Sequence, residues 1–407
     1  MRELLARSYR AAVAAADPLQ ILAPHLPRPP RGRTFVAAAG KAAASMGLAL
    51  ENAWPPDAPL DGIAVTRYQH GLPTRRIRVI EAGHPVPDAA GESAAREILS
   101  KAGTLQENDL LLALLSGGGS SLLAFPVQGL DMAELKRLTS ELLRSGATIQ
   151  EINTVRKHLS AIQGGRLAQA CRAPVLALII SDVTGDDPTH IASGPCTPDP
   201  TTIADARAVL GKYGIAFHGA FSETPKPGDG AFARTTNKVI ATAYRSLEAA
   251  AEVFRREGIA PVILGDTITG EARDVGREMA QLARRVRAEK AGPKALISGG
   301  ECTVTVKGEG GRGGRCAEFL LALGIGLDGM KDTWAIAADT DGIDGSEDNA
   351  GALLAPDSLQ RASSLGLSAQ ALLERHDSYG FFSALGDLVM TGPTRTNVND
   401  YRAIVLA

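Results

Sequence analysis

The sequence predicts an α/β protein of two α/β lobes, with a Rossmann-like parallel sheet in the larger N-terminal lobe and an active site in the interlobe cleft. Short apolar runs alternate with stretches of helical period along almost all of the 407 residues, a pattern typical of parallel sheets covered by helices on both faces. A stretch rich in Pro, Gly and Ser, Phe217–Arg234, interrupts this alternation and indicates a linker or long surface loop. We therefore expect one domain over residues 1–225 and a second over residues 235–407.

The apolar runs of the N-terminal lobe predict five buried strands, at Thr34–Ala38, Gly62–Thr66, Arg78–Glu81, Asp109–Leu115 and Val175–Ile180. Helical periodicity between or after them predicts helices at Asp88–Ala102, Asp131–Ser145 and Thr202–Tyr213. The second lobe should contain, in order, a helix at about Lys238–Glu257, strand Pro261–Leu264, helix Glu271–Lys290, strand Ala295–Ser298, a hairpin-like stretch in Thr303–Gly308, a helix from Arg315, strand Thr333–Ala337 and a last strand at Arg402–Leu406.

Composition excludes several classes of function. A formal net charge of -2 argues against a nucleic-acid groove or a membrane-surface protein, which need a cationic excess. The longest apolar runs have six residues, whereas a bilayer span needs about 20. The four cysteines show no spacing typical of a zinc site and are expected to be buried thiols in a reduced cytosol. We therefore expect a cytoplasmic protein.

Polar and glycine-rich segments follow five of the predicted strands. They are Gly40-Lys41, Ser116–Ser121, Ser181–Asp187, Ser298–Glu301 and Asp339–Gly345. Ligands of open parallel sheets bind at the carboxyl ends of strands. The five segments are therefore the first candidates for a binding or catalytic site.

The segment SGGGSS is the strongest candidate for binding an anion. Its members are Ser116, Gly117, Gly118, Gly119, Ser120 and Ser121. Glycines let several backbone N–H groups converge, and a helix that follows adds its positive end; the alternative is a tight strand-to-helix turn. Because no Gly-Lys-Ser/Thr closes the segment, it is not a Walker A loop. A cation that pairs with phosphate must therefore come from elsewhere in the chain. The candidates are Lys41 and Arg315, and Arg315 follows the glycine run 308–314.

Further polar residues complete the predicted site. Asp182, Asp186, Asp339 and Asp341 are hard oxygen donors at strand ends and suit Mg²⁺, although helix caps and turns compete with that role. Asn153 and Arg156 share one face of a helix and could bind a small carboxylate. Gly300 and Glu301 are further candidates for nucleotide contact. His84 lies in a rigid Gly-His-Pro turn, where a hydrogen bond to backbone is the expected role, not catalysis.

The order of these segments resembles the glycerate 2-kinase family with its C-terminal MOFRL domain. The resembling stretches are GKAAASMG, GHPVPDAAG, LLSGGGSSLL, EINTVRKHLSAIQGGRLA, SDVTGDDPTHIASGP, ISGGECTVTVKGEGGRGGRCAEF, ADTDGIDGSEDNAGA and TGPTRTNVND. The resemblance implies ATP-dependent phosphorylation of D-glycerate to 2-phosphoglycerate with a divalent metal, a glycerate kinase domain followed by a MOFRL domain, and Lys41 and Arg315 as the active-site pair. The chain has Cys316-Ala317 where the family usually shows Asn-Gln.

Two other functions compete with this one. A reductase acting on hydroxypyruvate or tartronate semialdehyde would accept a similar small acid, but the first strand is followed by AAAGKAAASMG, which contains no G-x-G-x-x-G. A non-catalytic sensor of phosphorylated metabolites would explain the anion loops but not two Asp clusters. The expected partners are D-glycerate and a nucleotide, with no nucleic acid and no membrane, and a homodimer is left open.

Overall fold

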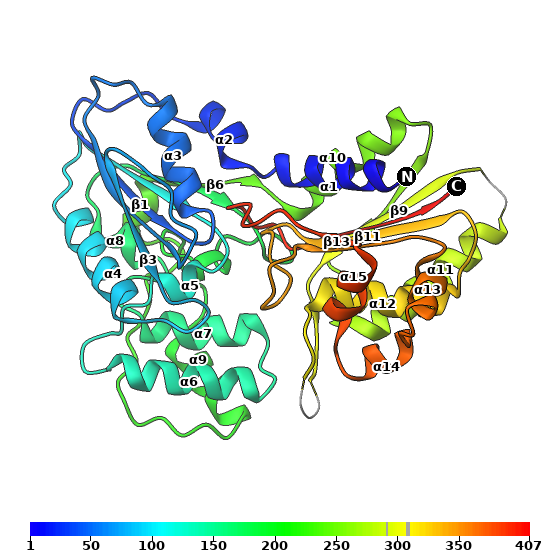
Figure 1. Ribbon diagram of the computed structural model, residues 1–407. Helices are drawn as coiled ribbons and strands as arrows, with labels where there is room; N and C mark the ends of the chain where they lie inside the picture. The colour runs from blue at the N-terminus through cyan, green and yellow to red at the C-terminus, as the bar shows by residue number, and fades with distance from the viewer. Residues whose placement is uncertain (290–291, 307–309) are drawn as a thin grey trace. The chain divides into compact units, whose positions relative to one another are not determined.

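The computed structural model describes residues 1–289, 292–306 and 310–407. Within them the chain forms two compact units (Figure 1). Pro18–Ile240 forms the N-terminal unit, whereas Met1–Asp17 and Ala241–Ala407 together form the C-terminal unit. These bounds differ from the expected ranges 1–225 and 235–407, because the first helix packs with the C-terminal unit and the expected linker leads into one more strand of the N-terminal unit.

The N-terminal unit contains a six-stranded sheet in the order β3-β2-β1-β4-β5-β6. Its strands are β1 (Thr34–Ala39), β2 (Leu60–Arg67), β3 (Ile77–Ala82), β4 (Leu110–Leu115), β5 (Val175–Ile180) and β6 (Thr235–Ala241). The first five pair in parallel with one another. This is the strand order of a Rossmann sheet, in which the direction of winding reverses between β1 and β4. The predicted fold class is confirmed.

Helices cover both faces of this sheet. Phe35, Ala37 and Ala39 of β1 pack in one core with Ala95 and Ile98 of α4. On the other face, α3 packs its Gly47 against Ala64 of β2. The helices of the unit are α2 (Pro18–Ile21), α3 (Ala43–Ala53), α4 (Ala89–Ala102), α5 (Gly119–Leu122), α6 (Met132–Arg144), α7 (Ile149–Leu159), α8 (Arg166–Ala170) and α9 (Ile203–Lys212), with 3-10 turns at Ala23–His25, Ile191–Ser193 and Gly230–Arg234.

The C-terminal unit contains a mixed six-stranded sheet in the order β13-β12-β11-β14-β9-β7. Its strands are β7 (Ala260–Gly265), β9 (Lys294–Gly300), β11 (Thr333–Asp339), β12 (Gly351–Leu354), β13 (Leu388–Val389) and β14 (Asp400–Leu406). Only β7 and β9 pair in parallel among these strands. The last strand, β14, is inserted between β9 and β11, so the end of the chain lies at the centre of this sheet.

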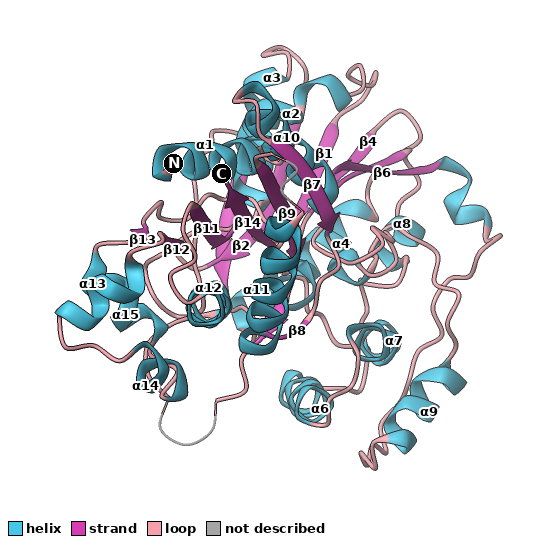
Figure 2. Cartoon of the chain, turned by 90° about the vertical axis from the view of Figure 1, so that its right-hand side faces the viewer, coloured by secondary structure: helices cyan, strands magenta, loops and turns pink. Residues whose placement is uncertain are grey.

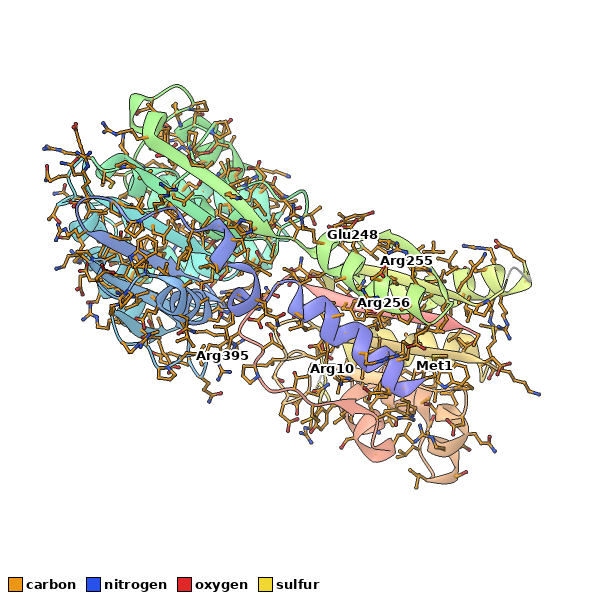
Figure 3. All side chains as sticks on the ribbon, turned by 90° about the horizontal axis from the view of Figure 1, so that it is seen from above. Met1, Arg10, Glu248, Arg255, Arg256 and Arg395 are labelled. Carbon is orange, nitrogen blue, oxygen red and sulfur yellow. The ribbon has the colours of Figure 1, made fainter. Side chains whose placement is uncertain are left out.

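Two pairs of helices sandwich the second sheet. Ala295, Ala403 and Val405 face a core shared with α1 (Arg2–Ala14) and α10 (Ala243–Arg256). Figure 3 shows α1 and α10 side by side, with Arg10 and Arg256 labelled on them. The opposite face packs on α11 and α12, which lie side by side in Figure 2. The remaining helices of this unit are α11 (Ala272–Ala288), α12 (Arg315–Leu327), α13 (Ser358–Ser364), α14 (Ala369–Glu374) and α15 (Ser378–Leu385).

Two expected elements are wrong. The helix expected at Lys238–Glu257 is preceded by β6, whose residues alternate in exposure as an edge strand does, and the helix itself is Ala243–Arg256. The hairpin expected in Thr303–Gly308 is replaced, in its described part, by the short strand β10 (Cys302–Thr303), which pairs in parallel with β8 (Gly270–Glu271). Lys307 and Gly308 lie outside the described residues. Apart from these, the predicted strands and helices lie within a few residues of the observed ones.

A buried glutamate organises the start of β3. Glu51 of α3 is 2% exposed, and its carboxylate accepts hydrogen bonds from the backbone N–H groups of Arg75 (2.8 Å), Arg76 (2.6 Å) and Ile77 (2.8 Å). Burial opposes ionisation, but the backbone donors outweigh it, so the pKa of Glu51 is lowered. A single charge thereby satisfies three donors at the edge of the sheet.

We expect Glu51→Gln to destabilise the N-terminal unit by about 1–3 kcal/mol, because the amide offers only one acceptor oxygen to three donors. The loss should shrink as the pH falls below about 4, since a carboxylate with a lowered folded-state pKa stabilises only while it is ionised. The chain has two tryptophans, so a Trp334→Phe background leaves Trp54 as the fluorescence reporter during urea unfolding. Glu107→Gln, at an exposed position, is the control. Equal midpoints for the two variants at pH 7 would contradict this role.

Candidate active site

The first part of the site forms where β1 and β4 end side by side. Gly40 has φ +130°, and a Cβ at this position would lie 2.1 Å from Ser116 Oγ. The backbone N–H of Lys41 donates to the carbonyl of Gly117 (2.8 Å), and that of Ala42 donates to Ser116 Oγ (3.0 Å). Lys41 is therefore fixed beside the SGGGSS segment, as the strand-end argument predicted. Ser116 itself is buried, and its hydroxyl oxygen accepts the hydrogen bond from the backbone N–H of Ala42.

Close approach explains why the segment is built from glycine. Gly118 has φ +80°, and a Cβ there would lie 2.8 Å from His84 Nε2 and 3.4 Å from Lys41 Cγ. A Cβ on Gly119 would lie 2.6 Å from the Cβ of Ala192. The tight strand-to-helix turn and the proposed anion-binding loop are thus two interpretations of the same backbone conformation. The helix that follows, α5, spans only Gly119–Leu122, so the loop contributes its own N–H groups more than a helix dipole.

The predicted carboxylate-binding pair is linked to this loop by hydrogen bonds. Arg156 donates from Nη1 to Asn153 Oδ1 (2.8 Å), and Ser193 Oγ donates to the same oxygen (3.1 Å). The Ser193 and Ser120 hydroxyls are 2.8 Å apart. Burial lowers the pKa of Arg156 to about 10, so the guanidinium stays charged at neutral pH. The side chain of Lys157, the next residue of the same helix, is buried against Asp199 (3.3 Å).

A pocket joins these groups within the N-terminal unit. Its walls include Ser120, Ser121, Arg156, Pro85 and Pro87. A cation, hydroxyl groups and the turn after β3 therefore surround one small space. In this structure the space between them is narrow, with room for about one water molecule.

The carboxylates after β5 form a turn beside this unit's sheet. Asp186 has φ +54°, and Asp187 accepts from the backbone N–H of Thr189 (2.8 Å), so Asp187 acts as a turn cap. In the described ranges, no three His, Cys, Asp or Glu side chains gather in a way that could hold a metal ion. Asp182 and Asp186 nevertheless offer oxygen donors of the kind Mg²⁺ takes one or two at a time, with phosphate oxygens and waters completing its shell.

The predicted site residues of the C-terminal unit lie around Arg315. This first residue of α12 donates to Asp400 (2.7 Å), Glu301 (2.9 Å) and Asp339 (2.6 Å). The sheet register explains the convergence, because Asp400 at the start of β14 pairs with the ends of both β9 and β11. Burial alone would lower the pKa of Arg315, but the carboxylates raise it well above its ordinary value.

The described part of the glycine run before Arg315, Gly310–Gly314, is packed against neighbouring segments. Gly311 donates its N–H to the carbonyl of Arg375 (2.8 Å), and a Cβ on Gly314 would lie 2.2 Å from Asp344 Oδ1. Arg312 pairs with Glu347 (2.6 Å) at the surface. Gly308 and Glu309 lie outside the described residues.

The acidic loop after β11 is held by its own backbone. Asp339 Oδ1 accepts from the N–H of Asp341 (3.0 Å), and Asp341 Oδ1 accepts from the N–H of Ile343 (2.9 Å). Asp344 accepts from the first N–H groups of α12, and burial raises its pKa to about 7. Gly300 is required by packing, since its Cβ would lie 2.2 Å from the carbonyl of Ile268. Asp339 is thus engaged by Arg315 and by backbone.

Sequence reasoning missed the pair at the centre of this cluster. Asp400 is buried and is shared between Arg315 and Arg402, whose Nη2 lies 2.7 Å from Asp400 Oδ2. Burial opposes ionisation of Asp400, but the two guanidinium groups lower its pKa. The sequence signal that could have revealed this pair was the presence of an Asp and an Arg near the start of an otherwise apolar last strand.

Comparison with known proteins covers nearly the whole chain. A model described as a domain of unknown function, DUF4147, matches residues 4–222, and the MOFRL family matches residues 294–400. A glycerate 2-kinase from Pyrococcus horikoshii is 39% identical over 93% of this chain and 87% of its own length. An Agrobacterium vitis protein named "Putative hydroxypyruvate reductase" is 50% identical over 100% of this chain and 94% of its own length.

The structural comparison points the same way. The crystal structure of a glycerate kinase from Thermotoga maritima matches with a TM-score of 0.89 and 35% identity, covering 100% of this chain and 99% of that one. Over the part of the chain that the structure describes, no helix has the length and apolar character to cross a bilayer.

We expect Asp400→Asn to destabilise the C-terminal unit by about 3–5 kcal/mol, because it leaves buried guanidinium groups without their counter-charge. Glu301→Gln removes another partner of Arg315 but from a side chain that is 55% exposed, so its cost should stay within about 1 kcal/mol. Urea unfolding followed by Trp334 fluorescence in a Trp54→Phe background measures both. Similar losses for the two variants would show that Asp400 does not hold the cluster together.

Proposed function

Because the chain belongs to the glycerate 2-kinase family, whose enzymes are phosphotransferases with an alcohol group as acceptor, we propose that it transfers the γ-phosphoryl group of ATP to the 2-hydroxyl of D-glycerate. The observation that carries this proposal is the single group formed by Lys41, the glycine loop and the Arg156 pocket. Two anion-binding features lie side by side there, as a reaction between a nucleotide phosphate and a small carboxylate requires.

The two ends of this group have different roles in the proposed reaction. In the loop 116–121, the backbone N–H groups of Ser116, Gly119 and Ser121 donate to carbonyls of the protein itself. The N–H groups of Gly117, Gly118 and Ser120 are the proposed donors to phosphate oxygens, and Lys41 supplies the cation that the loop lacks. Arg156 and Asn153 bind the carboxylate of glycerate, since a guanidinium can form two parallel hydrogen bonds to it. Phosphoryl transfer depends mainly on such positioning and charge neutralisation.

Mg²⁺ fits the donor chemistry of the strand-end carboxylates. Asp182 and Asp186 would hold it in the N-terminal unit, whereas Asp339 and Asp341 would have to exchange the Arg315 and backbone contacts described above. When bound with ATP, the ion neutralises charge on the phosphate oxygens. Gly300 and Glu301 stay candidates for nucleotide contact in the C-terminal unit.

Reduction of hydroxypyruvate is the second candidate, favoured by the name of the Agrobacterium vitis relative and by the Rossmann strand order. The turn after β1 counts against it. A dinucleotide fingerprint places three glycines there, whereas this chain has Gly40, Lys41 and then a run of alanines.

One assay separates the two functions. The protein is incubated with D-glycerate and Mg-ATP, and separately with hydroxypyruvate and NADH or NADPH. We expect ADP and 2-phosphoglycerate, identified by phosphorus NMR, and no oxidation of the reduced nucleotide. Nicotinamide turnover without ADP formation would overturn the proposal.

We expect Lys41→Met to lower kcat by at least about 10²-fold, because groups that stabilise charge in phosphoryl transfer are typically worth that much. The fold should survive, since Lys41 lies at a strand end. Lys101→Met, on the exposed surface of α4, is the matched control and should leave kcat unchanged. Wild-type turnover in a folded Lys41→Met protein would remove Lys41 from the transferring phosphate.

Arg315 is proposed as the second member of the active-site pair, acting where charge develops on the phosphoryl group. A lysine cannot reproduce its three-way contact with Asp400, Glu301 and Asp339. We expect Arg315→Lys to lower kcat by about 10-fold or more with little change in KM for ATP. Arg312→Lys, which alters a surface pair with Glu347 and the stacking of the guanidinium on Tyr379, should be nearly silent. If Arg315→Lys changes only KM for ATP, Arg315 binds ground-state nucleotide instead.

A further inference from the structure

The turn after β3 carries a histidine to the centre of the N-terminal site. His84 follows the edge strand β3, yet its imidazole reaches past β2 to the loop at the end of β4. A Cβ on Gly118 would lie 2.8 Å from His84 Nε2 and 2.9 Å from its Cδ2. Because Gly118 has no side chain, the imidazole ring occupies the space where a Cβ would lie. The ring therefore lies against the proposed phosphate loop.

The surrounding contacts hold this turn in place. The Asp88 carboxylate accepts from the N–H of Gly91 (3.0 Å) and from the Tyr68 hydroxyl (2.7 Å). A Cβ on Gly83 would lie 2.4 Å from the carbonyl of Val86, so the chain folds tightly around the histidine. His84 is thereby anchored on both sides, by β3 and by the cap of α4.

The neighbours of the imidazole include both halves of the proposed reaction. Lys41 Cγ lies 3.4 Å from the same Gly118 Cβ position, which places the lysine chain and the ring at one point of the loop. The next residues of the turn, Pro85 and Pro87, line the pocket that also contains Arg156 and Ser120. His84 thus lies beside the group assigned to phosphate, and the turn that carries it also lines the pocket that contains the group assigned to the substrate carboxylate.

From this placement we propose that His84 is the general base of the phosphoryl transfer, an inference that rests on the proposed kinase function. Nε2 takes the proton of the glycerate hydroxyl as that oxygen forms its bond to the γ-phosphorus. The bond from phosphorus to the β,γ-bridging oxygen breaks, its electron pair leaves with ADP, and the imidazolium later returns the proton to solvent.

The first test is the kinetics of His84→Ala, compared with His218→Ala at an exposed position. We expect kcat for ATP and D-glycerate to fall by about 10²-fold or more with His84→Ala, with KM for ATP changed less than about threefold, and no effect from His218→Ala. The wild-type enzyme measured in parallel establishes the kinase reaction itself. Its activity together with an unimpaired His84→Ala would overturn this inference while leaving the proposed function intact.

Chemical rescue separates a base from a structural side chain. Imidazole added to His84→Ala should restore part of kcat, whereas pyrazole, which has the same size and shape but is a far weaker base, should not. Equal rescue by both would show that the ring only fills space and would overturn the proposal. His84→Gln keeps a hydrogen-bonding group near Nε2 without a basic nitrogen and guards against a folding defect in the alanine variant. We expect it to remain as slow as His84→Ala, and recovery of wild-type kcat by Gln would assign the residue to phosphate contact instead.

Discussion

The approach of Gly40 to Ser116 is the constraint on which the N-terminal site depends. The two residues lie so close that no side chain fits at position 40, and the ends of β1 and β4 are joined there by backbone and hydroxyl hydrogen bonds. Winding reverses between these strands, so the chains leaving them diverge and open a crevice. Because Lys41 follows Gly40 and the glycine loop follows Ser116, one contact sets both sides of that crevice.

The same contact shows how far sequence reasoning reaches in this unit. Fully buried runs such as Leu110–Leu115 predict their own strands, since parallel strands covered on both faces lack alternation. Strand ends then predict which loops meet. The predicted proximity of Lys41 to Ser116–Ser121 needed only that rule. What it could not supply was the path of the turn after β3, because the reach of His84 depends on the packing of Tyr68 and Asp88 around it.

The C-terminal unit was harder to predict for a physical reason. Its central strand β14 comes last in sequence and pairs with β9 and β11, so its neighbours are set by contacts distant along the chain. The meeting of Arg315, Asp339 and Asp400 follows from that pairing and from nothing local. The edge strand β6 was missed for a related reason, since the half-exposed sequence TTNKVIA resembles the start of the helix that follows it.

The placement of α1 affects the order in which the chain can fold during synthesis. The N-terminal unit is one continuous stretch, Pro18–Ile240, and its segments all leave the ribosome before Ala241–Ala407. Helix α1 leaves first but packs against α10 and the sheet that contains β14, so its apolar face must wait for their translation. At roughly 5–20 residues per second, the residues between α1 and α10 take about 10 to 50 s to make. During that interval Leu4, Leu5 and Tyr9 have no core to enter.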